Sequence, residues 1–342
     1  MKKLDNSHGT LLSVVFSFRN EEKNLPELVP RLRSVLATEL NSGAISDYEL
    51  VFVNDASTDR SLDILREEAR GHKDIKIVNM SRTFGHSACV FAGFRYAAGD
   101  IVIYMDADLQ DPPEVIPDMI KVWKDRGNAD VVHTVRMSRA GEPRIKLWIT
   151  RLGYFILNRT SDIGIIPNAG DFKLLTRRVI DYLTSLNEKK PFMRGLVQWI
   201  GFKQEIVYYH RAERYSGKSK FFVLGPKVIM NFLESALISF SDAPLYLIAV
   251  FGFFVAFSSF LLLGYVLVGK YLNINVPGYT GIMATMLFLG GVQLISIGII
   301  GLYLSSIYLE NKGRPNYIVE STFGFDDSGT VDRDSRAPQK QR

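Results

Sequence analysis

The chain has 342 residues, with 41 Lys and Arg against 36 Asp and Glu, which gives a formal net charge of +5. At roughly 100–200 residues per domain, this length allows about two domains. So small a positive charge does not indicate a nucleic-acid binder, and no nucleic-acid partner is expected. The single cysteine, Cys89, excludes an internal disulfide and a zinc site built from several cysteines.

The first two thirds of the chain alternate short apolar runs with runs of helical period. The apolar run 11–18 is followed by charged residues and has no small-residue cleavage site, so we interpret it as a buried strand and not a signal peptide. Strands are predicted at Leu11–Phe18, Glu49–Asn54, Ile75–Asn79, Ile101–Met105 and Ala129–Thr134, and helices at Leu25–Leu40, Ser61–Arg70, Ser87–Ala98 and Pro113–Asp125. This alternation predicts an α/β domain around a parallel sheet that is covered on both faces.

Ligands of such sheets bind at the carboxyl ends of the strands, and polar residues follow each predicted strand here. The chain has neither G-x-G-x-x-G after the first strand nor G-x-x-x-x-G-K-[ST], which argues against a dinucleotide dehydrogenase and a P-loop ATPase. The residues at this edge are acidic instead. They point to a metal ion.

The pair Asp106 and Asp108 ends an apolar strand, and alternation along an extended segment puts both carboxylates on one side. Two carboxylates, with substrate phosphates completing the shell, are a usual way to hold Mg²⁺ or Mn²⁺. The pattern alone is weak, because Asp332 and Asp334 in the polar tail match it too. Its place after a core strand favours the first pair as the site, and a surface turn with acidic caps is the alternative.

Three other acidic positions have two interpretations each. Asp55 after the second strand could accept a hydrogen bond from a nucleotide base, or it could cap the helix that follows. Glu21 could face a ligand, or it could suit the dipole at a helix start. Asp171 could be functional, or it could be a turn residue before a strand.

Two long stretches near the C-terminus, 244–268 and 281–309, carry no charged side chain, and Lys270 between them is the only charge from Pro244 to Leu309. About 20 apolar residues span a bilayer core, so we predict a hairpin of two transmembrane helices, with two buried core helices as the alternative. The segment 221–243 is interpreted as an interfacial amphipathic helix, or as an extension of the soluble core. The basic flanks lie on one side of the hairpin, which predicts that both termini are cytoplasmic; they are Lys218, Lys220, Lys227, Lys312 and Arg314.

Several segments in order resemble one family. FRNEEKNL, VNDASTDRS, DADLQDPPE, GDFKLL, FMRGLVQWIGF and RYSGKSKF are similar to segments of the GT-A glycosyltransferases of family 2. More narrowly, they resemble the polyprenyl-phosphate glycosyltransferases, which include bactoprenol glucosyltransferases and dolichyl-phosphate mannose synthases. The resemblance covers about residues 10–315. It implies a Rossmann-like GT-A domain over 1–220, the interfacial helix 221–243, the hairpin 244–309 and a polar cytoplasmic tail 310–342.

The resemblance also implies a role for individual residues. Asp106 and Asp108 correspond to the ligands of Mg²⁺ or Mn²⁺ and the diphosphate, and Asp171 to the carboxylate proposed as catalytic. Arg136 and Arg139 correspond to arginines that hold the acceptor phosphate. The nucleotide sugar would be bound by Asn20, Glu21, Asp55, Asp59, Arg82, Gln110 and the basic loop Arg214, Lys218 and Lys220. Thr83 departs from the family pattern, where an asparagine is expected.

The implied enzyme is a metal-dependent hexosyltransferase of the inner or plasma membrane. It would transfer a hexose with inversion from a nucleotide sugar, UDP-glucose first, to polyprenyl (undecaprenyl) phosphate. GDP-mannose, UDP-N-acetylglucosamine and an amino-arabinose donor stay open, as does a catalytically inactive membrane nucleotide sensor. Two spans are too few for the channel of a processive polysaccharide synthase. Glycines in the second span, such as Gly298 and Gly301, would allow close helix packing in a homo-oligomer.

Overall fold

The computed structural model of the protein describes residues 9–126, 129–137, 166, 169–186, 188–189, 191–210, 243–272 and 278–325. These residues fall into two compact units. The sheet domain comprises the described residues up to 210 and those from 314 onward. The helical unit comprises 243–272 and 278–313.

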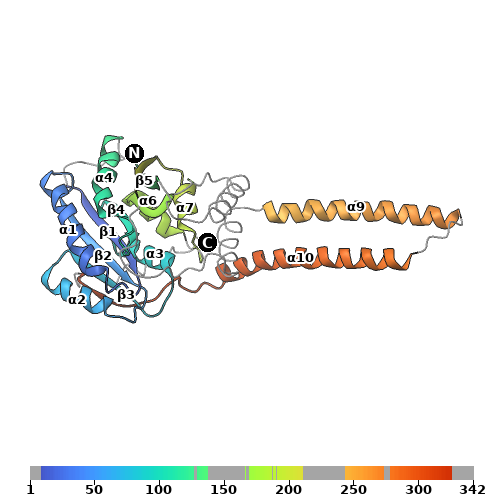
Figure 1. Ribbon diagram of the computed structural model, residues 1–342, viewed down its shortest axis with the longest axis horizontal. Helices are drawn as coiled ribbons and strands as arrows, with labels where there is room; N and C mark the ends of the chain where they lie inside the picture. The colour runs from blue at the N-terminus through green and yellow to red at the C-terminus, as the bar shows by residue number, and fades with distance from the viewer. Residues whose placement is uncertain are drawn as a thin grey trace, which may run out of the picture. The chain divides into compact units, whose positions relative to one another are not determined.

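A mixed β-sheet forms the centre of the sheet domain (Figure 1). Among the described residues it has eight strands, in the order β7-β5-β6-β4-β1-β2-β3-β8. The strands are β1 (Leu11–Phe18), β2 (Asp47–Asn54), β3 (Ile75–Met80), β4 (Ile101–Asp106), β5 (Val131–Arg136), β6 (Ala169–Thr176), β7 (Gln204–Tyr209) and β8 (Val319–Phe323).

The prediction of a parallel sheet is confirmed for one part and wrong for another. Strands β1 to β4 pair in parallel, but β6 runs antiparallel to both β4 and β5, and β8 runs antiparallel to β3. The alternation of strand and helix that indicates parallel pairing covers only the first part of the chain. It specifies no direction for β6 or β8. The segment 319–323, predicted as part of a polar tail, is therefore an edge strand of the sheet.

Each of the four helices predicted in the sheet domain begins and ends within two residues of its predicted bounds. The helices of this domain are α1 (Leu25–Asn41), α2 (Ser61–Gly71), α3 (His86–Tyr96), η1 (Pro113–Val115), α4 (Ile116–Asp125), α6 (Arg177–Ser185) and α7 (Met193–Trp199). The first turn of the fourth predicted helix is a 3-10 turn, and α6 and α7 were not predicted. Helix α4 packs on β5 and β7, and α3 packs on β1 and β2. The helices thus pack on the faces of the sheet, and the connecting loops lie at the carboxyl ends of the parallel strands.

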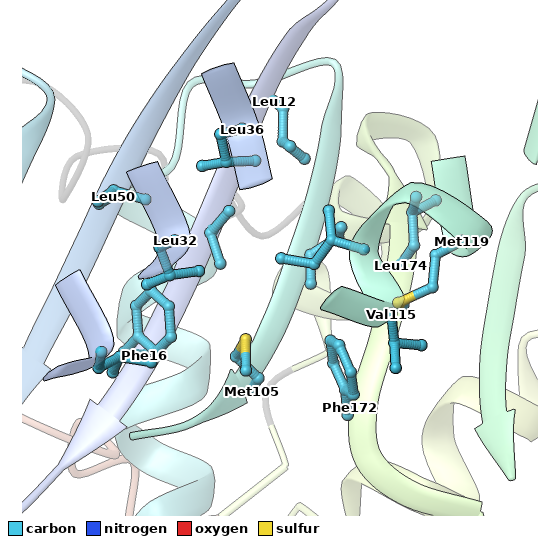
Figure 2. Close-up of a cluster of buried hydrophobic side chains, with 14 of the residues drawn as sticks. Leu12, Phe16, Leu32, Leu36, Leu50, Met105, Val115, Met119, Phe172 and Leu174 are labelled. Atoms are coloured by element: carbon cyan, nitrogen blue, oxygen red, sulfur yellow. The ribbon is translucent and has the colours of Figure 1, made fainter. Parts of the chain in front are cut away.

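The two faces of β1 pack against different helices, as the alternation of its side chains requires. Leu12 and Phe16 lie in the same buried cluster as Leu32 and Leu36 of α1 (Figure 2). On the opposite face α3 approaches so closely that a Cβ at Gly93 would lie 2.2 Å from Val15 Cγ1. Only a glycine leaves room for the sheet at that point.

The helical unit contains two long helices that contact each other, α9 (Ala243–Tyr271) and α10 (Tyr279–Asn311) (Figure 1). Both cover the stretches predicted as transmembrane helices. Within the described residues, one helix is long and apolar enough to cross a membrane, Phe288–Asn311 in α10. That α9 forms a second span stays a prediction. The predicted interfacial helix 221–243 lies outside the described residues, apart from its last residue.

Candidate functional site

The carboxyl ends of β1, β2 and β4 surround a pocket of about 200 Å³. The last residues of β1 and β4 and the loops that follow the three strands supply its walls, together with the first residue of α3. The lining residues are Ser17, Phe18, Arg19, Glu21, Asp55, His86, Asp106, Ala107 and Asp108. The structure thus brings four of the acidic residues singled out in the sequence into one small, polar space.

The two carboxylates of the D-x-D segment lie side by side in this pocket. Asp106 ends β4, and its Oδ1 lies 3.5 Å from Nδ1 of His86. Asp108 is 9% exposed, and its Oδ1 accepts a hydrogen bond from the backbone N–H of Gln110 at 3.1 Å. Leu109, between Asp108 and Gln110, has φ of +59°, a left-handed conformation that turns the chain at this point.

The local charge at Asp106 favours a cation. Burial raises the pKa of its carboxyl to about 6; His86 opposes this shift, and the negative charges of Asp108, Asp171 and Asp111 add to it. Like charges held this close are expensive unless a positive ion joins them. Oxygen ligands of this kind suit Mg²⁺ or Mn²⁺, so the residues present fit such an ion. No group of three or more His, Cys, Asp or Glu arranged to hold a metal is found among the residues described.

Asp55 lines the pocket and also fixes the start of α3. Its carboxylate accepts hydrogen bonds from the backbone N–H of Phe84 at 2.7 Å and of Gly85 at 3.2 Å. The alternative that Asp55 caps the following helix, α2, is wrong. Asp59, two residues before Ser61 at the start of α2, accepts hydrogen bonds from the backbone N–H and the hydroxyl of that serine.

Asn20 and Asp59 hold the loops after β1 and β2 together. Asn20 Oδ1 accepts a hydrogen bond from the backbone N–H of Thr58 at 2.8 Å, and Asp59 Oδ2 accepts one from that of Glu22 at 3.2 Å. Glu21, between these contacts, lines the pocket and also accepts a hydrogen bond from Asn24 Nδ2. Asn20 and Asp59 are not among the residues that line the pocket; they hold in position the two loops that line it.

Arg82 and Gln110 are not among the residues that line the pocket. The guanidinium of Arg82 lies over the ring of Phe84, 4.0 Å from its centre, and donates a hydrogen bond to the carbonyl of Thr83. Gln110 contributes its backbone N–H to Asp108. The structure therefore assigns neither side chain a direct place beside the carboxylates.

Asp171 lies on β6 and forms an ion pair that the sequence analysis did not predict. Arg194 of α7 donates from Nη2 to Oδ2 at 2.6 Å and from Nε to Oδ1 at 3.1 Å. Burial alone would raise the pKa of Asp171, but the charges of Arg194 and of the fully buried Lys173 outweigh it and hold that pKa well below its usual range. The segment FMRGLVQWIGF contains Arg194, yet nothing in its spacing indicates the partner.

Arg136 at the end of β5 is held in a fixed position. Its Nε donates to the Tyr209 hydroxyl at 3.1 Å, and its Nη2 lies 3.5 Å from the carboxylate of Asp111, to which Tyr209 also donates. A Cβ at Gly170 would lie 2.9 Å from Arg136 Nη2, so the guanidinium lies directly over the residue before Asp171. The remaining predicted site residues, Arg139, Arg214, Lys218 and Lys220, lie outside the described residues.

Comparison with known proteins gives a consistent result. The model of the family described as glycosyl transferase family 2 matches residues 13–184. Over 320 residues the chain is 40% identical to the uncharacterized glycosyltransferase sll0501 of Synechocystis sp., covering 92% of this chain and 96% of that protein. It is 37% identical over 311 residues to the bactoprenol glucosyl transferase of Shigella phage SfV, covering 91% and 98%. A solved mannosyltransferase, PcManGT of Pyrobaculum calidifontis in complex with GDP-Man and Mn²⁺, is 15% identical with a TM-score of 0.41, covering 86% and 88%.

Proposed function

Because the chain belongs to glycosyl transferase family 2, we propose that it transfers a hexose from a nucleotide sugar, UDP-glucose first, to a polyprenyl phosphate such as undecaprenyl phosphate. The observation that carries this proposal is the pair Asp106 and Asp108 in a pocket at the carboxyl ends of the strands. The near full-length similarity to a bactoprenol glucosyl transferase supports the choice of donor and acceptor.

The donor diphosphate would lie beside Asp106 and Asp108. A Mg²⁺ or Mn²⁺ ion held by these carboxylates would neutralise the negative charge that develops on the leaving diphosphate. Asp55 and Glu21, which line the same pocket from neighbouring loops, are proposed to contact the nucleoside. The basic loop with Arg214, Lys218 and Lys220 is also proposed to bind the nucleotide sugar, on the basis of the sequence resemblance alone.

The acceptor is a phosphate monoester with a second pKa near 6, so it is largely dianionic at neutral pH. One of its oxygens attacks the anomeric carbon as the bond from that carbon to the diphosphate breaks, and direct displacement inverts the anomeric centre. This step needs no strong general base. Asp171, which Arg194 and Lys173 keep ionised, is proposed to position the sugar or the acceptor.

Arg136 and Arg139 are the proposed ligands of the acceptor phosphate, because a guanidinium offers paired donors that match phosphate oxygens. The contacts of Arg136 with Tyr209 and Asp111 fix its direction before a ligand arrives. A fixed guanidinium loses less conformational entropy on binding than a free one.

The apolar helices are proposed to keep the enzyme where its acceptor is. With α9 as a second span beside the candidate span in α10, domain 1–220, the interfacial helix 221–243 and both termini would face the cytoplasm. A lipid phosphate lies in the headgroup plane, so an anchored enzyme avoids a three-dimensional search. A homo-oligomer through the glycines of the second span belongs to the same proposal.

The test is transfer of radiolabelled sugar from nucleotide sugars into a solvent-extractable lipid, with Mg²⁺, Mn²⁺ or EDTA present. We expect labelling with one donor of a panel that begins with UDP-glucose, and its loss with EDTA. Asp106→Asn with Asp108→Asn should lower the rate by about 10²-fold or more. Asp332→Asn with Asp334→Asn, the same pattern in the tail, is the matched control and should leave it unchanged. Nucleotide binding with no lipid labelled by any donor would contradict the proposal and favour a nucleotide sensor.

A further inference from the structure

Strand β8 carries a β-bulge that aims one acidic side chain at the sheet. Its register with β3 shifts at Met80, because Ser321 pairs with Asn79 while Val319 pairs with Met80. Glu320 is therefore the extra residue of the bulge. Bulges commonly redirect a side chain, and here the carboxylate of Glu320 accepts a hydrogen bond from Asn79 Nδ2 at 2.7 Å.

The buried side-chain amides of Asn79 and Asn54 connect this contact on β8 with the loop that follows β2. Asn54 Nδ2 donates to Asn79 Oδ1 at 2.7 Å, and the backbone N–H of Ser57 donates to Asn54 Oδ1 at 3.0 Å. Asn54 and Asn79 are 1% and 8% exposed. The chain of hydrogen bonds thus runs from Ser57 through both amides to Glu320.

The direction of this chain is fixed by what each group can donate or accept. An amide has one accepting oxygen and one donating nitrogen, so with Asn54 Oδ1 turned to Ser57, its nitrogen must donate to Asn79. Because Oδ1 of Asn79 accepts that bond, its Nδ2 must donate to a group on the other side, toward β8. A carboxylate only accepts, so Glu320 closes the chain in the one orientation that satisfies every member. Reversal of either amide would set two donors or two acceptors against each other.

The inner end of the chain is the turn that brings Asp55 to the pocket. Ala56 in this turn has φ of +51°, a left-handed conformation that residues with a Cβ rarely adopt. The bond from Ser57 N–H to Asn54 holds the turn closed around it. Ser57 also accepts a hydrogen bond from the backbone N–H of Asn20, so the turn sets the place of both pocket loops.

We propose that Glu320 is a positioning residue for the nucleoside part of the donor site, acting through Asn79 and Asn54 on the turn at Asp55. This inference rests on the proposed function. It gives the strand that follows the membrane helix in the chain a part in substrate binding. Loss of the carboxylate leaves Asn79 Nδ2 only the longer contact with Ser321 Oγ, at 3.5 Å, and loosens the orientation of both amides. The affected step is binding of the nucleotide sugar, because none of these residues lies among the pocket carboxylates that would meet the diphosphate.

The experiment uses the full-length chain in detergent with Glu320→Leu, Glu320→Gln and the control Thr322→Ala on the same strand. Donor KM, acceptor KM, kcat, the Kd for UDP and the melting temperature are measured for each. E320L should raise the donor KM and the Kd for UDP by about 3- to 10-fold, the usual effect of one lost hydrogen bond. E320Q retains an accepting oxygen and should restore both values, and T322A should change neither. In E320L, kcat and acceptor KM should stay at the wild-type values.

Two results would overturn the inference. One is a wild-type donor KM and UDP affinity in E320L. The other is a fall in kcat and melting temperature that E320Q shares, with the donor KM unchanged, because that indicates a structural role alone. Glu320 is an exposed residue, so these variants are expected to fold. If the wild-type chain binds UDP but labels no lipid, the proposed transfer fails, while the comparison of UDP affinities still decides the role of Glu320.

Discussion

The guanidinium of Arg194 and the carboxylate of Asp171 form a two-point ion pair between α7 and β6, with the shorter contact at 2.6 Å. This pair changes the chemistry that Asp171 can perform. A carboxylate whose pKa is held well below its usual range is a poor proton acceptor at neutral pH. The proposed acceptor is already deprotonated there, so a fixed negative charge is more useful to the reaction than a base.

Replacement of Arg194 by Gln should therefore change both the stability of the protein and the dependence of that stability on pH. Asp171, whose side chain is 20% exposed, would lose its main counter-charge. This loss costs on the order of 1–3 kcal/mol, at the lower end because a third of the Arg194 side chain is exposed as well. The melting temperature should fall by roughly 3–10 °C. Its measurement in detergent, with Arg178→Gln on neighbouring α6 as the control, checks this.

The sign of the pH effect follows from the lowered pKa of Asp171. The ion pair contributes stability at every pH above the ordinary carboxyl pKa of about 3.9 and loses it as pH falls through the lower folded value. The deficit of R194Q should thus be constant from pH 8 down to about 5 and shrink in stronger acid. A deficit that grows on acidification would contradict the assignment.

Arg136→Gln should abolish transfer to polyprenyl phosphate while the protein still sediments with membranes. The guanidinium is oriented by Tyr209 and Asp111, and glutamine supplies neither its charge nor its paired donors. Lipid labelling and sedimentation of the same preparation test this. Arg144→Gln is the control and should retain transfer, because we expect this basic residue, eight positions further along the chain, to contact the lipid surface and not the acceptor phosphate. Loss of sedimentation in R136Q would instead indicate a lipid-surface role for Arg136.

The lowered pKa of the buried His133 predicts a loss of stability in mild acid. Burial and the charge of Lys173 lower its pKa to about 4, although a hydrogen bond with Gln204 opposes the shift. The unfolded chain binds a proton here below about pH 6.5 and the folded protein does not until about pH 4, so stability falls as pH drops through this range.

His133→Gln should remove this contribution. The fall in melting temperature between pH 7 and pH 5 should be smaller than in the wild type, by the equivalent of about 2 kcal/mol. Exposed His72→Gln is the control, and its melting temperature should follow the wild type across the same range. Equal falls in H133Q and the wild type would show that His133 titrates alike in the folded and unfolded chains.

Gly93→Ala should destabilise the sheet domain by about 1–3 kcal/mol, the usual effect of overpacking a core. The added Cβ would lie 2.2 Å from Val15 Cγ1 and 3.2 Å from Val53 Cγ2, so α3 must move away from the sheet. Gly71→Ala is the matched control, since a Cβ there would have no atom within 4 Å. Thermal unfolding of both variants checks the prediction; a wild-type melting temperature in G93A would contradict the close packing of α3.

Much of the first part of the sheet domain could be predicted because its signals are local. Apolar runs of strand length alternate with runs of helical period up to 134, and the strands and helices found there follow the prediction closely. The position of Asp106 and Asp108 at the end of β4 follows from the same pattern. Strand β8 has no such signal, because the sequence VESTF shows no apolar alternation that separates it from a polar tail.

The sequence by itself determined the βα alternation, the acidic edge of the sheet and the long apolar helices, since each depends on residues that are neighbours in the chain. Only the tertiary structure decided the antiparallel direction of β6 and β8, the bond of Asp55 to the start of α3, and the partners of Asp171 and Glu320. Glu320 and Asn79 are 241 positions apart in the chain. Contacts at such separations leave no periodic trace in composition or spacing, because they are selected by the packing of the whole sheet and not by the local backbone.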